Sequence, residues 1–296
     1  SKQSPIVSII GMGGGMGGFA LVSSSSDSQK TYVEEVFNTH LYEGVGIGGS
    51  TPRDITTGID LDTNDGMVWI KCRDAALDNA LFDTKREAEN MLRSEGTAIT
   101  LLDINSLTSF NSDGYTTKGS AYTNINSATG GGGYVAWTFR QQKGFFDVVT
   151  YTGNATAGRT VSHNLGCVPG MIIIKCTSFA AGGGWVVYHK SLGNANAIWL
   201  NDTTAASPYA YWNNTSPTST EFTLNNDGDI NGTSDMLPSG TGHEYVAYLF
   251  ADGDAAAAQI FGDDKDESII KCGSVNIGGL GTFDVDLGWE PQYVLI

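Results

Sequence analysis

A heptapeptide pattern occurs twice with differences at two positions, first as Gly66-Met67-Val68-Trp69-Ile70-Lys71-Cys72 and again as Gly170-Met171-Ile172-Ile173-Ile174-Lys175-Cys176. Each copy is apolar apart from its lysine. Side chains two positions apart lie on one face of a β-strand, so Cys72 shares a face with Val68 and Ile70. The pattern predicts one buried strand in each of two repeats, and it makes both cysteines small buried hydrophobes.

Two further blocks match in the same order. Residues 37–44 (FNTHLYEG) correspond to residues 146–153 (FDVVTYTG), and residues 134–139 (YVAWTF) correspond to residues 245–250 (YVAYLF). Three matched blocks in one order indicate an internal duplication. Each copy has about 105 to 125 residues, a reasonable size for one sandwich domain.

The duplication divides the chain into five parts. We predict an extended N-terminal arm over residues 1–35, a first β-sandwich repeat over 36–143 and a second over 144–254. An acidic linker would follow over 255–267, and the start of a third repeat over 268–296, because residues 286–296 align with residues 164–174. Since this alignment ends inside a strand, we expect the natural polypeptide to continue.

Strand and turn patterns set the fold class. Val135, Trp137 and Phe139 alternate with their neighbours, which is typical of a half-buried strand. Turn sequences such as Asn111-Ser112-Asp113-Gly114 separate the strands. Residues 83–92 favour one helical turn at most. Many short strands predict an all-β chain of tandem antiparallel β-sandwich domains of the jelly-roll or concanavalin-like kind.

Composition excludes several classes of protein. The chain has 32 acidic and 16 basic residues and a net charge of −16, which opposes sequence-neutral nucleic-acid binding. Its apolar fraction of 40%, with many aromatic residues, argues against disorder. No apolar run reaches the 18 residues or so that a membrane helix needs. The four cysteines form no Cys-x-x-Cys pair and no zinc spacing, so we predict neither disulfides nor a metal site from them.

The N-terminal 22 residues are rich in glycine, methionine and aliphatic residues. Six glycines interrupt the apolar stretch, and this favours a retained flexible arm over a cleaved secretory signal. Such an arm would gain order by packing on a partner. The residues that would provide its apolar contacts are Ile6, Val7, Ile9, Ile10, Met12, Met16, Phe19, Leu21 and Val22.

The repeated blocks resemble modules encoded by phages of marine bacteria, especially cyanophages. The resemblance covers roughly residues 36–296 and is strongest in the second copy, through residues 159–166 and 168–175. It implies a concanavalin- or laminin-G-like β-sandwich of a virion structural protein, often a tail fibre. It also implies a location in the virion tail, docking on other tail proteins of the adaptor or nozzle type, and a homotrimer. The arm of residues 1–35 matches no fibre anchor.

Patterns of catalysis and metal binding are weak. The sequence has no nucleophile elbow and no phosphate loop, its four histidines are scattered, and His163 falls in an expected turn. We therefore predict no enzyme and no cofactor. Asp60, Asp62 and Asn64 are weak calcium candidates, but the position that would hold the twelfth-place glutamate of an EF-hand loop is Lys71. Ordinary Asx turns are the favoured interpretation.

Aromatic residues cluster in the second copy as Trp199, Tyr209, Tyr211 and Trp212. Aromatic faces beside Asn and Asp side chains would suit stacking against a glycan of a host-surface polysaccharide. Because aromatic side chains mostly fill cores, core packing is favoured for Trp199 and Trp212.

The leading functional prediction is a non-enzymatic phage tail fibre. Its arm would anchor it to the tail, and its sandwiches would be displayed for host attachment. The alternatives are a host-surface glycan-binding module proper and a capsid decoration protein using the same modules.

Overall fold

The computed structural model describes residues 30–45, 52–119, 125–126, 132–179, 183–233, 242–276 and 284–296. Within these ranges the chain is all-β, with antiparallel sheets, short 3-10 turns and one four-residue helix, α1 (Gly228–Asn231). The predicted all-β class is therefore confirmed. The nine apolar residues expected to anchor the arm, from Ile6 to Val22, lie outside the described residues.

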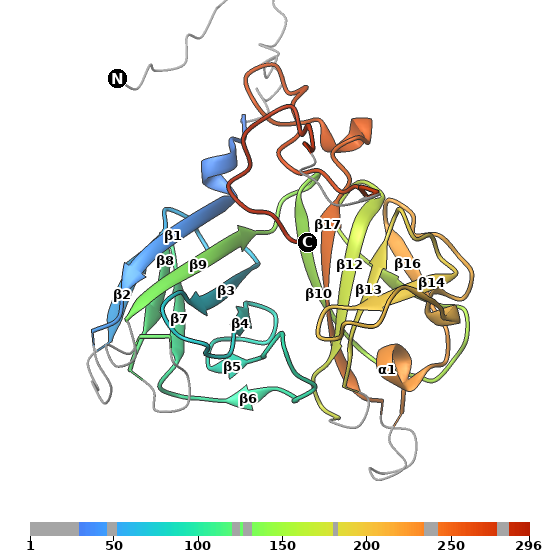
Figure 1. Cartoon of the computed structure of the whole chain (residues 1–296), viewed down its shortest axis with the longest axis horizontal. Coiled ribbons are helices and arrows are strands. Elements are labelled where there is room, and N and C mark those ends of the chain that lie inside the picture. The colour runs from blue at the N-terminus through green and yellow to red at the C-terminus, as the bar shows by residue number, and fades with distance from the viewer. Residues whose placement is uncertain are drawn as a thin grey trace, which may run out of the picture.

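The described residues between 36 and 143 form lobe 1, at the left of Figure 1. Its large sheet has the order β1 (Phe37–Glu43), β9 (Gly133–Arg140), β3 (Gly66–Cys72), β4 (Ala80–Asp83). The facing sheet has the order β2 (Arg53–Thr56), β8 (Gly114–Thr117), β7 (Leu107–Asn111), and a short pair joins β5 (Asn90–Met91) to β6 (Leu101–Leu102).

The described residues between 144 and 254 form lobe 2, at the right of Figure 1. Its large sheet has the order β10 (Phe146–Thr152), β17 (Glu244–Ala251), β12 (Pro169–Cys176), β13 (Trp185–His189), β14 (Asn196–Trp199), β15 (Ser207–Pro208). The facing pair is β11 (Arg159–Ser162) with β16 (Glu221–Leu224).

The two lobes share one strand plan. The order β1-β9-β3-β4 in lobe 1 recurs as β10-β17-β12-β13 in lobe 2. The register recurs too, since Phe37 pairs with Phe139 and Phe146 pairs with Phe250. The repeated sequence blocks thus occupy equivalent places in equivalent sheets.

A repeated tyrosine pair lies at the same end of each sandwich. Tyr42 stacks on Tyr134 with ring centroids 5.3 Å apart, and Tyr151 stacks on Tyr245 at 5.1 Å. The hydroxyl of Tyr42 donates to the Ile125 carbonyl at 2.6 Å, and that of Tyr151 donates to the Ile230 carbonyl at 2.7 Å. The duplication therefore preserves buried hydrogen bonds as well as strand order.

A repeated arginine covers each tyrosine pair. The Arg53 guanidinium lies over the Tyr42 ring and that of Arg159 lies over the Tyr151 ring, 5.7 and 5.2 Å from the ring centroids. Arg159 also donates to the buried Asn231 side chain at 3.1 Å. Both arginines donate to the backbone at the end of the first strand of their lobe. This arginine–tyrosine contact ties the first two strands of each copy together.

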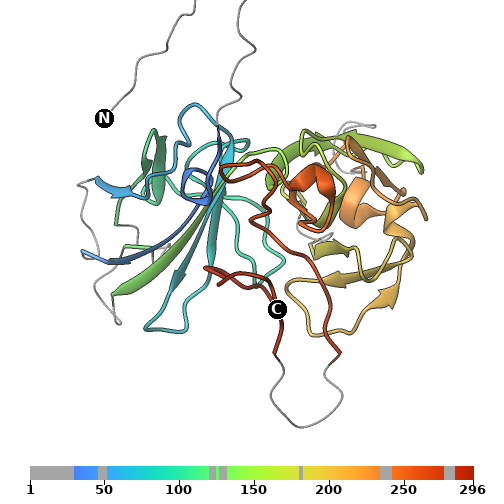
Figure 2. The same cartoon turned by 90° about the horizontal axis from the view of Figure 1, so that it is seen from above.

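Both faces of β17, in the large sheet of lobe 2, are buried. In β17, Tyr245 and Leu249 face the core of lobe 2, while Val246, Tyr248 and Phe250 face a second core that lies between the lobes. The sequence indicated half-buried strands for this block. The structure differs because the large sheets of the two lobes pack against each other, as Figures 1 and 2 show.

Residues 83–92 form a turn, where the sequence favoured one helical turn. β4 ends at Asp83, whose carboxylate accepts from the Arg86 backbone N–H at 2.9 Å. Glu87 and Glu89 have φ of 69° and 70°, in the left-handed region. Two left-handed residues separated only by Ala88 are incompatible with a right-handed helix.

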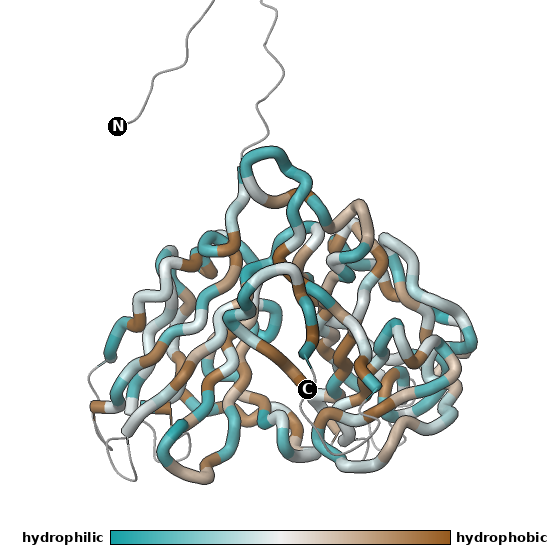
Figure 3. The backbone as a smooth tube through the Cα atoms, turned by 45° about the horizontal axis from the view of Figure 1, so that its top comes forward, coloured by the Kyte–Doolittle hydropathy of each residue, from teal (hydrophilic) through white to brown (hydrophobic). Residues whose placement is uncertain are grey.

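The C-terminal part of the chain packs against both lobes. Ala258 is buried in the core of lobe 2 and Phe261 in the core between the lobes, so the segment predicted as a linker is packed. Tyr293 packs on Trp137, with centroids 5.1 Å apart, but residues 292–296 lie in no strand. Figure 3 shows this apolar end, in brown, between the lobes.

Candidate functional site

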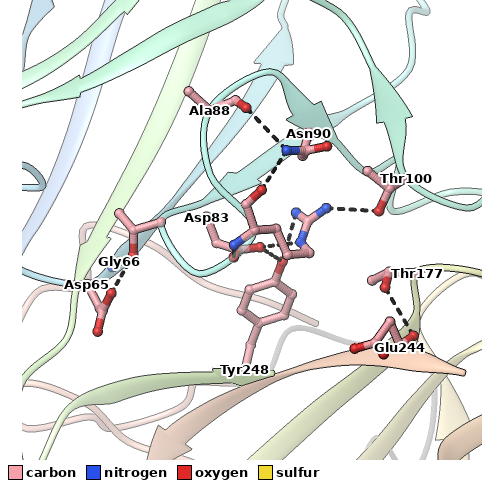
Figure 4. Close-up of polar contacts among 11 residues, drawn as sticks. Asp65, Gly66, Asp83, Ala88, Asn90, Thr100, Thr177, Glu244 and Tyr248 are labelled. Carbon is pink, nitrogen blue, oxygen red and sulfur yellow. Dashed lines mark hydrogen bonds and ion pairs between the residues drawn. The ribbon is translucent and has the colours of Figure 1, made fainter. Parts of the chain in front are cut away.

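A buried polar cluster connects the two lobes (Figure 4). Asp83, at the end of β4 in lobe 1, accepts from the Arg86 Nε at 2.6 Å and from the Tyr248 hydroxyl of lobe 2 at 2.7 Å. Arg86 also donates to the Thr100 hydroxyl at 3.3 Å. Asp83 and Tyr248 are 0% and 1% exposed and the Arg86 side chain is 8% exposed, so these three side chains have little contact with water. We call Asp83, Arg86 and Tyr248 the polar bridge.

The electrostatics of the polar bridge indicate a structural ion pair. Burial raises the pKa of Tyr248 well above its usual value, and the Asp83 charge adds to the shift. Burial opposes the charge of Arg86, but Asp83 outweighs it, so the pKa of Arg86 is raised. Arg86 thus stays charged and Tyr248 stays neutral, and neither is poised to exchange a proton near neutral pH.

A loop of lobe 1, residues 93–100, forms the second link between the lobes, and we call it the strap. Trp185 of β13 donates its indole N–H to the carbonyls of Arg93 and Gly96 at 3.0 and 3.2 Å. The Lys175 ammonium donates to the Thr97 carbonyl at 3.0 Å and to the Gly183 carbonyl at 2.8 Å. Burial lowers the pKa of Lys175 from 10.5 to about 8.

The core between the lobes leaves little free space. A cavity of about 10 Å³ lies there, lined by apolar residues that include Met67, Ile173 and Leu200. This volume is about that of one water probe, so the cavity is too small for an organic ligand.

The four aromatic residues singled out in the sequence have different environments. Trp212 is fully buried in the core of lobe 2. Tyr209 is 43% exposed and stacks on Tyr211 with centroids 5.1 Å apart and planes 10° apart. Trp199 meets Tyr209 edge to face at 4.9 Å. We call Trp199, Tyr209 and Tyr211 the aromatic ledge.

Hydrogen bonds fix the loops that carry the aromatic ledge. The Tyr211 hydroxyl donates to Asp229 at 2.8 Å, and burial together with this contact raises the pKa of Tyr211. The Tyr209 backbone N–H donates to the Ala195 carbonyl at 3.1 Å. The Tyr211 ring and the backbone of Tyr209 are therefore held in place by hydrogen bonds within the protein.

The calcium candidates form an Asx turn. The Asp60 carboxylate accepts from the backbone N–H groups of Asp62 and Thr63 at 3.0 and 3.1 Å and from the Asn64 side chain at 2.9 Å. Burial opposes the ionisation of Asp60, but hydrogen bonds from the Thr63 hydroxyl and from the backbone N–H groups of Thr63 and Asp62 outweigh it and lower its pKa. Within the described ranges, no group of three or more His, Cys, Asp and Glu side chains could hold a metal ion.

His163 and the cysteines are buried structural residues. His163 accepts from the Leu165 backbone N–H at 3.3 Å inside a turn, and burial lowers its pKa. All four cysteines are buried and free, and Cys72 and Cys176 end equivalent strands in equivalent cores, as their spacing predicted. No described helix is long and apolar enough to cross a membrane.

Sequence reasoning missed both links between the lobes. Asp83 and Tyr248 are 165 positions apart, so no local pattern joins them. The one available indication was Tyr248 itself, because its counterpart in the first repeat is Trp137, and a polar hydroxyl in a buried strand needs a partner.

Comparison with known proteins gives one match. Residues 33–273, most of the chain, match the model of a family described as "Domain of unknown function (DUF7483)". No curated protein and no solved structure matches the chain.

Proposed function

The chain belongs to the DUF7483 family, and we propose that it is a non-enzymatic structural protein of a phage virion, a component of the tail fibre. In this proposal the lobes are tandem jelly-roll or concanavalin-like sandwiches carried behind an extended N-terminal arm. They form a rigid unit that is displayed for host attachment.

One observation carries the proposal: buried ionisable side chains connect the lobes. Asp83 and Arg86 are sequestered together with Tyr248, and Lys175 is directed to backbone carbonyls of the strap. Such groups at a catalytic centre would face substrate. Here they hold the two repeats in one orientation, which suits a protein that must stay rigid under mechanical force.

The acidic composition is consistent with this role. A net charge of −16 keeps a large assembly soluble and repels nonspecific anionic partners. The partners we propose are other tail proteins, bound by the arm, and further copies of this chain in a homotrimer. The arm supports this through composition, because glycine allows close backbone approach while nine aliphatic, methionine and phenylalanine side chains supply apolar contact.

Labelling of whole phage particles tests the proposal. A gold-tagged antibody raised against the purified chain should decorate the tail in electron micrographs. Decoration of the capsid would favour the decoration-protein alternative, and a chain found only outside particles would overturn both.

A second experiment tests the arm. Deleting residues 2–22 should abolish incorporation of the protein into particles while leaving the purified chain folded. Particles that keep a full complement of the truncated chain would refute the proposed anchor.

A further inference from the structure

The exposed ring of Tyr209 is supported from behind. One side of this ring stacks on Tyr211 at 5.1 Å, Trp199 closes one edge at 4.9 Å, and 43% of the residue remains exposed. A ring backed in this way offers a flat apolar face at the surface. The apolar C–H face of a pyranose ring is the kind of flat surface that packs on such a face.

The aromatic ledge is rigid. Trp199 lies so close over Gly184 that a Cβ built there would be 2.6 Å from its ring. Asp229 holds Tyr211 through the 2.8 Å hydrogen bond, and the Asn194 side chain donates to the Ser216 hydroxyl at 3.1 Å across the adjoining loops. A ligand on this surface would order few side chains, so little binding energy would be lost.

The segment that carries the aromatic ledge is almost uncharged, and the Tyr211 hydroxyl of the ledge contacts a carboxylate, that of Asp229. Residues 191–220 contain one charged side chain, Asp202, and no Lys or Arg, but they are rich in Asn, Ser and Thr. Exposed residues of this segment, such as Asn214 and Thr204, offer amide and hydroxyl groups. A neutral, hydroxyl-rich ligand fits this chemistry, whereas an anionic one would have no cation to meet and would approach a chain of net charge −16.

The segment of lobe 1 that corresponds to residues 190–220 differs from them in composition and in what it contacts. Residues 84–106 follow β4 as residues 190–220 follow β13, and they include the charged residues Lys85, Arg86, Glu87, Glu89, Arg93, Glu95 and Asp103. That segment contains the strap and docks on lobe 2 through Trp185 and Lys175. In lobe 2 the corresponding position instead carries stacked aromatic rings with one exposed face.

We propose that the aromatic ledge is a carbohydrate-binding site that takes a neutral hexose unit of a glycan, with the sugar ring stacked on Tyr209. This inference rests on the proposed function, since it names the ligand of the displayed lobe. Tyr209 and Trp199 are the contact residues, and Tyr211 is a positioning residue that holds Tyr209.

Isothermal titration of the purified full chain tests the proposal. The probes are neutral α-glucan, β-glucan, mannan and galactan oligosaccharides, with oligogalacturonate as the acidic comparison. We expect at least one neutral probe to bind, and Tyr209→Ala to weaken it at least tenfold. The matched control is Tyr32→Ala, another exposed tyrosine (37%), which should leave the affinity unchanged. Because Tyr209 is exposed, its variant should keep the wild-type circular dichroism.

Three results would overturn the inference: no neutral probe binds at millimolar concentration, oligogalacturonate binds more tightly than every neutral probe, or Tyr209→Ala binds as well as wild type. These outcomes are separate from those of particle labelling. If labelling finds the chain on the tail but titration shows no binding of a neutral probe, the proposed function stands and only the proposed ligand is rejected.

Discussion

The Asp83 side chain has no exposed surface, so two protein groups stabilise its buried carboxylate in place of water. Arg86 supplies the opposite charge, and Tyr248 supplies a hydrogen bond at 2.7 Å from the other lobe. Arg86→Met would leave Asp83 buried and uncompensated, and we expect it to lower the free energy of unfolding by about 3 to 5 kcal/mol. Tyr248→Phe removes the hydroxyl that donates to Asp83 and accepts from Arg86 at 3.5 Å but leaves the ion pair in place, and it should cost about 1.5 to 3 kcal/mol.

Urea denaturation of both variants measures the difference, and Tyr209→Phe, at an exposed tyrosine, provides the baseline. The description of the polar bridge would be wrong if Arg86→Met cost no more than Tyr248→Phe. It would also be wrong if Tyr248→Phe behaved like Tyr209→Phe.

Lys175 makes the free energy of unfolding depend on pH in the alkaline range. Its pKa in the folded chain is about 8, below the usual 10.5, because burial disfavours the ammonium. Between these pH values the unfolded chain binds a proton that the folded chain does not, so stability rises with pH across this window. Across the whole window the free energy of unfolding rises by about 3 kcal/mol, since each pKa unit corresponds to 1.36 kcal/mol.

Comparison with Lys175→Met isolates this contribution from that of tyrosines such as Tyr248, whose pKa is raised in the folded chain and which ionises at about pH 10 only when unfolded. Urea unfolding at pH 7.5 and pH 10 should show the wild type gaining stability relative to the variant as pH rises. Equal pH slopes for the two chains would contradict the assignment.

At the scale of elements, Asn231 holds one end of lobe 2 together. Its side chain accepts from the Asn154 backbone N–H at 3.0 Å and donates to the Thr156 and Asn225 carbonyls at 3.0 and 2.9 Å. It thereby links the chain after β10, the turn before β11 and the chain after β16. Because the residue is fully buried, Asn231→Ala leaves several groups unpaired and should cost about 2 to 4 kcal/mol.

The first repeat supplies a control for this prediction. Asn126 of lobe 1 accepts from the Val45 backbone N–H and from Arg53, but at 3.3 and 3.5 Å. Chemical denaturation should therefore show a smaller loss for Asn126→Ala than for Asn231→Ala. The reverse order would mean that these hydrogen bonds do not determine the stability of the sandwich ends.

The elements differ in how far sequence could predict them. Duplication alone located β3 and β12 and placed Cys72 and Cys176 in equivalent cores. Alternation in the block at 134–139 indicated one buried face, yet both faces are buried, because a second sheet covers the other one. The continuous apolar run Ile172–Ile174 was the better indicator, since strands buried on both faces lack alternation.

Less of the candidate site than of the strands could be predicted from the sequence. Clustering in sequence pointed to Trp199, Tyr209 and Tyr211, because β14, β15 and the following turn bring near neighbours together. It also pointed to Trp212, which the fold turns into the core. The left-handed φ of Glu87 and the long-range partner of Asp83 depend on tertiary contacts that no local pattern encodes.

At the scale of the molecule, the lobes form one packed stack. One core lies inside each sandwich, and a third lies between the large sheets, where Phe139, Tyr248 and Phe250 pack together. The third core is rich in aromatic side chains, and Phe139 meets Phe250 edge to face at 5.7 Å. Neither lobe can unfold without exposing the apolar sheet of the other.

We therefore expect the lobes to unfold together. Urea unfolding followed by tryptophan fluorescence and by circular dichroism should give one coincident transition. Ile173→Ala, in the core between the lobes, should cost about 2 to 5 kcal/mol and shift both signals equally. Leu249→Ala changes the core of lobe 2 alone. It should also shift both signals equally, because the two lobes unfold cooperatively. Two separated transitions in either variant would show that the core between the lobes is too weak to couple them.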